Sequence, residues 1–145
     1  MALFKFAAIM GSLFLAVGVL GFTDGLVTSP HAEDPSLTVE EHYGRLLGMF
    51  PINTLHNWVH TLIGIAGLLA WRNIWSPQAY AKFIGGFYAV LTVMGVIPGL
   101  HTMMGLVPIF GHDVWLHALS SVLGIYFGWF YSPTRLSAPQ GSVAT

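Results

Sequence analysis

The segment from Phe50 to Trp71, FPINTLHNWVHTLIGIAGLLAW, constrains the fold most, because it is apolar enough to cross a bilayer yet contains two histidines and two asparagines. In an α-helix, successive residues are rotated by about 100°, so these four polar side chains share one stripe with Gly64 and Gly67. The opposite face consists of large apolar side chains. A membrane helix of this kind turns its polar stripe toward other helices and its apolar face toward lipid. The segment therefore predicts a helix inside a membrane-embedded bundle.

The composition agrees with an integral membrane protein. Hydrophobic residues make up 54% of the 145 residues, and charged residues make up only 8%. The net charge of −1 gives no basic surface for nucleic acid. The chain has no cysteine, which excludes disulfides, iron–sulfur clusters and thiolate metal sites.

Four apolar runs organise the chain, and each is close to the roughly 20 residues that a spanning helix needs. They cover residues 6–22, 52–71, 83–100 and 114–131. Lys5 precedes the first run as in a signal peptide, but no small-x-small cleavage site follows, so we expect this run to remain as a helix. We predict one transmembrane domain over residues 1–131, with an acidic loop at 29–50 and a tail at 132–145.

The basic residues predict the orientation in the membrane. Four of them lie on one side of the expected spans and one lies on the other, within the acidic loop; these are Lys5, Arg72, Lys82 and Arg135, against Arg45. The positive-inside bias places both termini in the cytoplasm and the 29–50 loop outside. A bacterial plasma membrane is the expected location, with a thylakoid membrane as the alternative.

The two halves of the chain repeat one another. RLLGMFPI at 45–52 aligns with TMMGLVPI at 102–109, and at the same offset of 57 residues Trp58-Val59-His60 aligns with Trp115-Leu116-His117. The preceding helices align at an offset of 74 residues, which brings Gly11 opposite Gly85. The pattern predicts an all-α four-helix bundle made from a duplicated two-helix hairpin, with a pseudo-two-fold axis along the membrane normal. Repeat one covers about 6–71 and repeat two about 80–131.

Two motifs resemble those of a known family. LLGMFPINTLHNWVHTLIGIAGL, at 46–68, resembles the signature of an uncharacterised bacterial membrane family, domain of unknown function 4383. Residues 113–117, DVWLH, are similar to its second element, Asp-x-x-Leu-His. This chain departs from the family in having Phe110-Gly111-His112 where Asn and a small residue precede the Asp. The resemblance implies four membrane helices and no particular activity.

The strongest site candidates are His60 and His117, because the repeat places them at equivalent positions on two helices. Each follows a polar residue by four positions, His56 and Asp113 respectively, so both members of each pair lie on one helix face. Two histidines at this spacing are common in metal sites, and an aspartate one turn away can ligate or orient an imidazole. Three further residues are candidates as additional ligands or as partners of the ligands: Asn53, Asn57 and His112.

The polar residues allow two kinds of role. They can hydrogen-bond across the helix interfaces and serve only to fix the packing. Alternatively, His60 and His117 can ligate a haem or a chlorophyll, or the cluster can hold a transition metal.

Three function classes follow, and we favour the first. An accessory or scaffold subunit, in contact with the lipid bilayer and with a larger membrane complex or a second copy, fits the small size and apolar surface. A cofactor carrier is the alternative, and a proton-linked transporter is the third candidate. An enzyme is not favoured, because the chain lacks a His-Glu-x-x-His motif, a phosphate loop and a nucleophile paired with a base.

Overall fold

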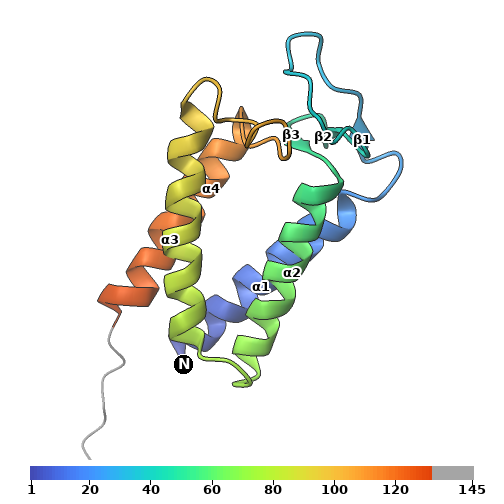
Figure 1. The fold of residues 1–145 in the computed structure, drawn as a ribbon. Coiled ribbons are helices and arrows are strands. Elements are labelled where there is room, and N and C mark those ends of the chain that lie inside the picture. Colours follow the sequence, from blue (N-terminus) through green and yellow to red (C-terminus); the bar gives the residue numbers. More distant parts are fainter. Residues whose placement is uncertain (132–145) are drawn as a thin grey trace, which may run out of the picture.

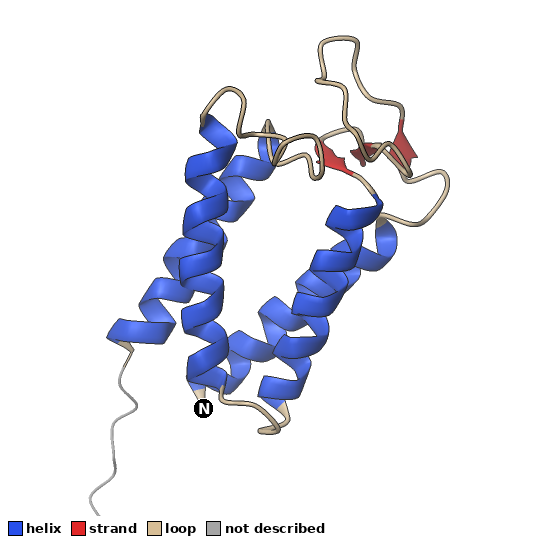
Figure 2. Cartoon of the chain, viewed as in Figure 1, coloured by secondary structure: helices blue, strands red, loops and turns tan. Residues whose placement is uncertain are grey.

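The computed structural model describes residues 1–131 and is mostly helical (Figures 1 and 2). Within these residues the helices are α1 (Ala2–Leu20), α2 (Thr54–Trp71), α3 (Pro77–Val96) and α4 (His112–Ile125), and α4 continues into one π-helical turn, η1 (Tyr126–Phe130). The four predicted helices are thus present. Helix α3 begins six residues before the predicted run, because the Ser76 side chain accepts a hydrogen bond from the Ala79 amide and Pro77 occupies the first turn. The predicted tail, 132–145, lies outside the described residues.

The helices pack as two hairpins. Helix α1 packs chiefly on α2, and α3 packs chiefly on α4 and η1. Figure 1 shows the two pairs beside each other, with the long connections at one end and the short α2–α3 connection near the N-terminus at the other end. The apolar core between the pairs includes Phe6 and Phe14 of α1 and Tyr80, Ile84 and Tyr88 of α3.

Glycines allow close approach of the two helices within each hairpin. A methyl group built at Gly67 of α2 would lie 2.6 Å from the Cα of Gly11 of α1. A methyl group built at Gly124 of α4 would lie 2.7 Å from the Cα of Gly85 of α3. Contacts this short exclude a side chain, so the backbones touch. The repeat alignment predicted the correspondence of Gly11 with Gly85 at an offset of 74, and the offset of 57 that aligns the two Trp-x-His segments also aligns Gly67 with Gly124.

The turns that precede α2 and α4 also match. Leu47 and Gly48 have φ of 53° and 72°, and their counterparts Met104 and Gly105 have φ of 59° and 85°. In both turns the amide of the glycine donates to the carbonyl three residues earlier, at 3.1 Å and 3.0 Å. Left-handed conformations are uncommon for residues such as Leu and Met, so their occurrence at both positions is an informative similarity.

The acidic connection contains a small sheet that no sequence pattern predicted. Strands β1 (Val27–Thr28), β2 (Gly44–Leu46) and β3 (Phe50–Ile52) pair antiparallel in the order β1-β2-β3. The sheet lies at the end of the helices where both long connections meet (Figure 1). The segment expected to be only a loop at 29–50 is therefore held by strands at both of its ends.

Arg45 anchors this connection. Its Nε donates to Asp34 Oδ2 at 2.8 Å, one Nη contacts the other carboxylate oxygen, and the second Nη donates to the Met49 carbonyl at 3.1 Å. The side chains of Arg45 and Asp34 are only 11% and 3% exposed. Hydrogen bonding to Arg45 holds the pKa of Asp34 below its ordinary value. The basic residue predicted to lie outside is thus neutralised by a buried carboxylate.

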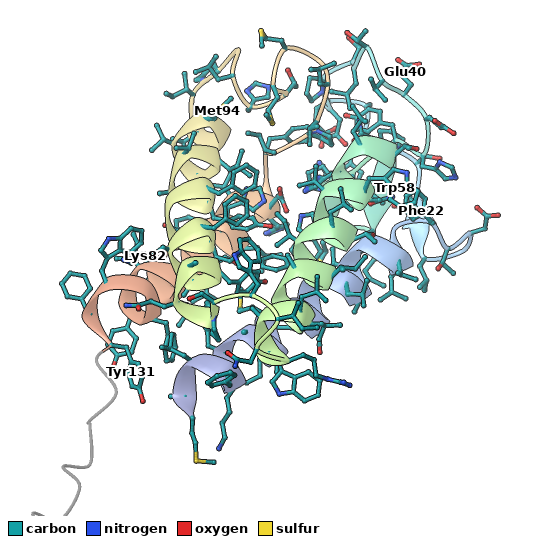
Figure 3. All side chains as sticks on the ribbon, turned by 60° about the horizontal axis from the view of Figure 1, so that its bottom comes forward. Phe22, Glu40, Trp58, Lys82, Met94 and Tyr131 are labelled. Atoms are coloured by element: carbon teal, nitrogen blue, oxygen red, sulfur yellow. The ribbon has the colours of Figure 1, made fainter. Side chains whose placement is uncertain are left out.

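Within residues 1–131, two helices are long and apolar enough to cross a membrane, α1 and α3. Only a third of the residues in each apolar window are buried within the protein, so most of both helices faces outward. Figure 3 shows Lys82 on α3 and Glu40 on the long connection, far apart on the molecule. Lys5, Arg72 and Lys82 are all exposed and belong to the end opposite the sheet.

Candidate metal centre

Asn53 caps α2 and sets the direction of its first turn. The Asn53 Oδ1 accepts a hydrogen bond from the His56 amide at 3.0 Å, which is the usual role of Asn at a helix N-cap. Its Nδ2 donates to the carbonyls of Val39 and Leu106, at 2.9 Å and 2.7 Å. Asn53 is completely buried. It therefore ties the first turn of α2, which carries His56, to the connections of both halves.

Helix α4 presents its polar residues inward from the other hairpin. Gly111 precedes it with φ of 65°, a conformation that favours glycine. Asp113 and His117 lie four residues apart on the face turned to the interior and are 4% and 1% exposed. The helix thus delivers one carboxylate and one imidazole to the interior.

Three histidines converge where α2 and α4 face each other. One nitrogen of each of His56, His60 and His117 lies within 4.8 Å of the other two. The Nε2 atoms of His56 and His60 are 2.8 Å apart. Asp113 Oδ2 lies 3.1 Å from His117 Nε2 and 3.7 Å from His56 Nε2. We call these four residues the His/Asp cluster.

Three of the separations between donor atoms are close to those expected around a single metal ion. In a tetrahedral site with metal–nitrogen bonds of about 2.0–2.1 Å, neighbouring ligand atoms lie about 3.4 Å apart. The three short separations in the His/Asp cluster, 2.8, 3.1 and 3.7 Å, lie on both sides of that value.

Several polar atoms of the cluster have no hydrogen-bond partner in the part of the chain that the structure describes. They include Nδ1 of all three histidines, Nε2 of His117 and Oδ2 of Asp113. The carbonyls of Pro51 and Pro108 lie near the His56 ring, without a hydrogen bond of normal geometry to its Nδ1. A buried polar group left without a partner costs several kcal/mol in an apolar environment. The cluster therefore gathers more donor and acceptor atoms than its own contacts satisfy.

Aromatic and aliphatic side chains enclose the cluster. Tyr88 of α3 is fully buried, its ring centroid lies 4.9 Å from that of His117, and it stacks on Phe14 of α1 at 5.0 Å. On the α3 side there is a cavity of about 60 Å³, lined by His56 and His60 together with apolar residues such as Met103. An apolar enclosure of this kind limits water access and strengthens electrostatic interactions inside it.

The remaining candidates lie outside the His/Asp cluster. Asn57 is buried, but its carboxamide packs against Gly21 at the end of α1, and neither of its polar atoms has a partner among the described residues. His112 is exposed and its ring contacts the edge of Phe50, at 6.3 Å between centroids. Asn53 is used by the α2 cap. Of the predicted site residues, the structure thus brings together His56, His60, His117 and Asp113.

Tyr88 lies beside the cluster and was not predicted from the sequence. Tyr80, Ile84 and Tyr88 are spaced by four residues and form one buried face of α3. That spacing is a sequence signal, because two tyrosines one above the other within a membrane-length run place two hydroxyl groups in an apolar interior.

The comparison with family models identifies the chain. Residues 5–130 match the family described as domain of unknown function DUF4383, so the chain belongs to that family, as the resemblance of its motifs indicated. Among curated proteins and solved structures, none matches it.

Proposed function

We propose that this DUF4383 protein is a small multi-pass membrane protein that holds one transition-metal ion between His56, His60, His117 and Asp113. The observation that carries the proposal is the convergence of three imidazole nitrogens within 4.8 Å, with a carboxylate oxygen at 3.1 and 3.7 Å from two of them. The ligands come from facing helices of two hairpins, as in metal sites built inside helix bundles. The metal would join the two hairpins at this point.

The donor set favours a borderline metal ion. Imidazole and carboxylate ligands suit Zn²⁺, Fe²⁺, Cu²⁺ and Ni²⁺. The chain has no cysteine, so it offers no thiolate, the ligand that softer metal ions prefer. A single ion is favoured over the haem or chlorophyll considered from the sequence. Two hollows that are lined in part by His60 hold about 60 Å³ and about 220 Å³, whereas pockets for larger organic ligands run from about 300 to 1,000 Å³.

Apolar side chains on the outer faces support the placement of all four helices in a membrane. Large aliphatic residues are exposed on each helix, including Leu13 (56%), Leu62 (62%), Val93 (58%) and Val122 (63%). Soluble proteins rarely expose large apolar side chains over so much of their surface, whereas a bilayer covers such side chains. Helix α2 has 18 residues, and α4 with η1 has a continuous helical path from His112 to Phe130.

The tryptophans and cations support the proposed depth and orientation. Trp58 and Trp115 are exposed near the first turns of α2 and α4, and the other three tryptophans, Trp71, Trp75 and Trp129, are exposed near the opposite end. Two such groups are typical of aromatic belts at the two membrane surfaces. Lys5, Arg72 and Lys82 accompany the second group, which favours the cytoplasm at that end. His60 is two residues, or about 3 Å, beyond Trp58 along α2, which supports a position of the cluster near the outer surface.

A duplication accounts for the site. The equivalent glycine contacts, the matching left-handed turns and the Trp-x-His repeats all support two copies of one hairpin. In the second copy Asp113 stands at the position of His56. The duplication thus supplies the equivalent imidazoles of His60 and His117. The difference between His56 and Asp113 at the other matched position supplies the carboxylate.

The test is the metal content of the protein purified in mild detergent. We expect about one transition-metal ion per chain by elemental analysis, and loss of most of it in the double variant His60→Leu/His117→Leu. His112→Leu is the matched control, because this histidine is on α4 but exposed. Asp113→Asn keeps the shape of the fourth ligand's side chain. It is therefore a test variant that should disturb folding less than the double variant does. A wild-type protein that takes up no metal after exposure to Zn²⁺, Fe²⁺ and Co²⁺, or a double variant that retains it, contradicts the proposal.

The second candidate is the accessory or scaffold subunit favoured from the sequence, in which the cluster only fixes the packing. The direct contacts His56–His60, at 2.8 Å, and His117–Asp113, at 3.1 Å, favour it. This function predicts a metal-free protein that copurifies with a larger membrane assembly. The same metal analysis therefore separates the two candidates.

A further inference from the structure

We infer that residues 37–39 form a strap that closes the outer end of the proposed metal centre, and that the Arg45–Asp34 pair keeps the strap closed. The inference rests on the proposed function, because the strap would govern how fast the metal ion enters and leaves. The strap belongs to the acidic connection and is hydrogen-bonded to the second connection, residues 97–111, which joins α3 to α4. Both connections meet at the same end of the helices (Figure 1).

The position of the His/Asp cluster limits the routes open to an ion. His56 is the third residue of α2 and Asp113 is the second residue of α4, so the cluster begins in the first turn of each helix. Farther along the helices lies the apolar core, which includes Phe14 and Tyr88, and in the proposed placement lipid surrounds the bundle. A metal cation loses its hydration in such surroundings at a large cost in free energy. The favourable route therefore passes between the connections at the outer end.

The second connection covers the cluster at that end. Three of its residues line the cavity of about 60 Å³ together with two of the proposed ligands; the lining includes Met103, Val107 and Ile109, with His56 and His60. Ile109 is only 1% exposed. Movement of this connection would open the cluster to the outer side.

The strap holds the second connection in place. The amides of Thr38 and Val39 both donate to the Gly105 carbonyl, at 2.8 Å and 3.3 Å. Asn53 Nδ2 donates to the carbonyls of Val39 and Leu106, so one buried carboxamide joins the strap to the same connection. These contacts fasten the second connection across the outer end of the cluster.

The Arg45–Asp34 pair fastens the start of the strap. Asp34 lies three residues before the strap, and Arg45 belongs to β2, which pairs with β3 directly before α2. The Arg45 guanidinium also lies 5.9 Å from the ring centroid of Phe110, in the second connection. Loss of the Asp34 charge leaves a largely buried guanidinium without its counterion. The strap should then open more often.

The first experiment measures release of Co²⁺ from the purified full-length protein to an excess of EDTA, followed by the loss of Co²⁺ absorption. We expect Asp34→Asn to release Co²⁺ at least tenfold faster than wild type, at a rate that does not depend on the EDTA concentration. Its equilibrium affinity should change less than twofold, because neither Arg45 nor Asp34 is a hydrogen-bond or ion-pair partner of the cluster within residues 1–131. Glu33→Gln is the matched control, since this neighbouring carboxylate is 78% exposed.

The second experiment locks the strap with a disulfide. A Cβ built on Gly105 lies 3.4 Å from the Cβ of Thr38, close to the range of about 3.5–4.5 Å found in disulfides. The chain has no cysteine of its own. In the double variant Thr38→Cys/Gly105→Cys, oxidation should slow Co²⁺ release at least tenfold. The reduced form of the same protein is the control, because it carries the same strain at Gly105, where φ is 85°.

The outcomes separate the strap from the metal centre. Release from Asp34→Asn at the rate of Glu33→Gln overturns the strap, and so does equal release from the oxidised and reduced double variant. Faster release from Asp34→Asn with an equal loss of affinity also overturns it, because the pair would then hold the ligands and not a gate. Each of these results leaves a Co²⁺-loaded protein and the metal centre intact. A protein that takes up no Co²⁺ overturns both proposals.

Discussion

The glycine contacts allow a quantitative prediction of how much the close packing of the two helices within each hairpin contributes to stability. Replacing Gly67 or Gly124 with alanine places a methyl group 2.6 Å or 2.7 Å from the Cα of the facing glycine. Carbon atoms at optimal contact lie about 3.5–4.0 Å apart, so each helix pair must separate by roughly 1 Å. Overpacking of this kind costs about 1–3 kcal/mol of the free energy of unfolding.

The matched control is Gly86→Ala, in the same helix as Gly85. Gly86 is exposed, and a methyl group there meets nothing within 4 Å. Alanine is a better helix former than glycine by about 0.8–1.0 kcal/mol, so this variant should be as stable as wild type or more stable. The expected difference between either buried variant and the control is therefore about 1–3 kcal/mol.

The assay is equilibrium unfolding in mixed micelles with increasing SDS, followed by the fluorescence of the five tryptophans. Because the sequence alignment pairs Gly67 with Gly124 and their contacts are similar, we expect similar losses of stability for both. The reasoning is refuted if both buried variants fall within about 0.5 kcal/mol of the Gly86→Ala control, a range typical of neutral surface changes. A loss at only one of the two positions would refute the equivalence of the hairpins.

Three further predictions concern the connections and the cluster. Because Arg45 lowers the pKa of Asp34, the ionised carboxylate stabilises the 29–50 connection above the ordinary Asp pKa, and this stabilisation is lost as the pH falls through the lowered pKa. In the Asp34→Asn variant, the free energy of local unfolding of the connection should fall by about 2 kcal/mol at neutral pH and should no longer depend on pH. Amide exchange, corrected for intrinsic rates, measures this free energy. Exchange equal to that of wild type contradicts the prediction. Since the chain has no cysteine, Glu40→Cys and Ser76→Cys should react with an impermeant maleimide from the outer and cytoplasmic sides respectively; the reverse pattern refutes the orientation. Asp113→Asn should weaken Co²⁺ binding about 10–100-fold, measured by absorption titration; unchanged affinity excludes the carboxylate as a ligand.

The sequence alone determined the helices and the faces that carry the polar groups. Apolar runs of membrane length predicted the four helices, because backbone groups in an apolar environment must bond within their own segment. The i, i+4 spacing put His56 with His60 and Asp113 with His117, since this spacing follows from helix geometry alone. The internal repeat put His60 and His117 at equivalent positions, because each follows the same Gly-x-x-Pro-Ile turn by the same number of residues.

The tertiary structure decided which of these faces meet and which atoms remain free. No local pattern showed that His56 Nε2 lies 3.7 Å from Asp113 Oδ2, because that distance depends on how the α1–α2 hairpin packs against the α3–α4 hairpin. The role of Asn53 in the α2 cap also depends on carbonyls of two distant connections. The sheet escaped prediction for the same reason. Its strands have two or three residues, too few for an alternating pattern, and Val27 finds its partner Leu46 only after the connection folds back.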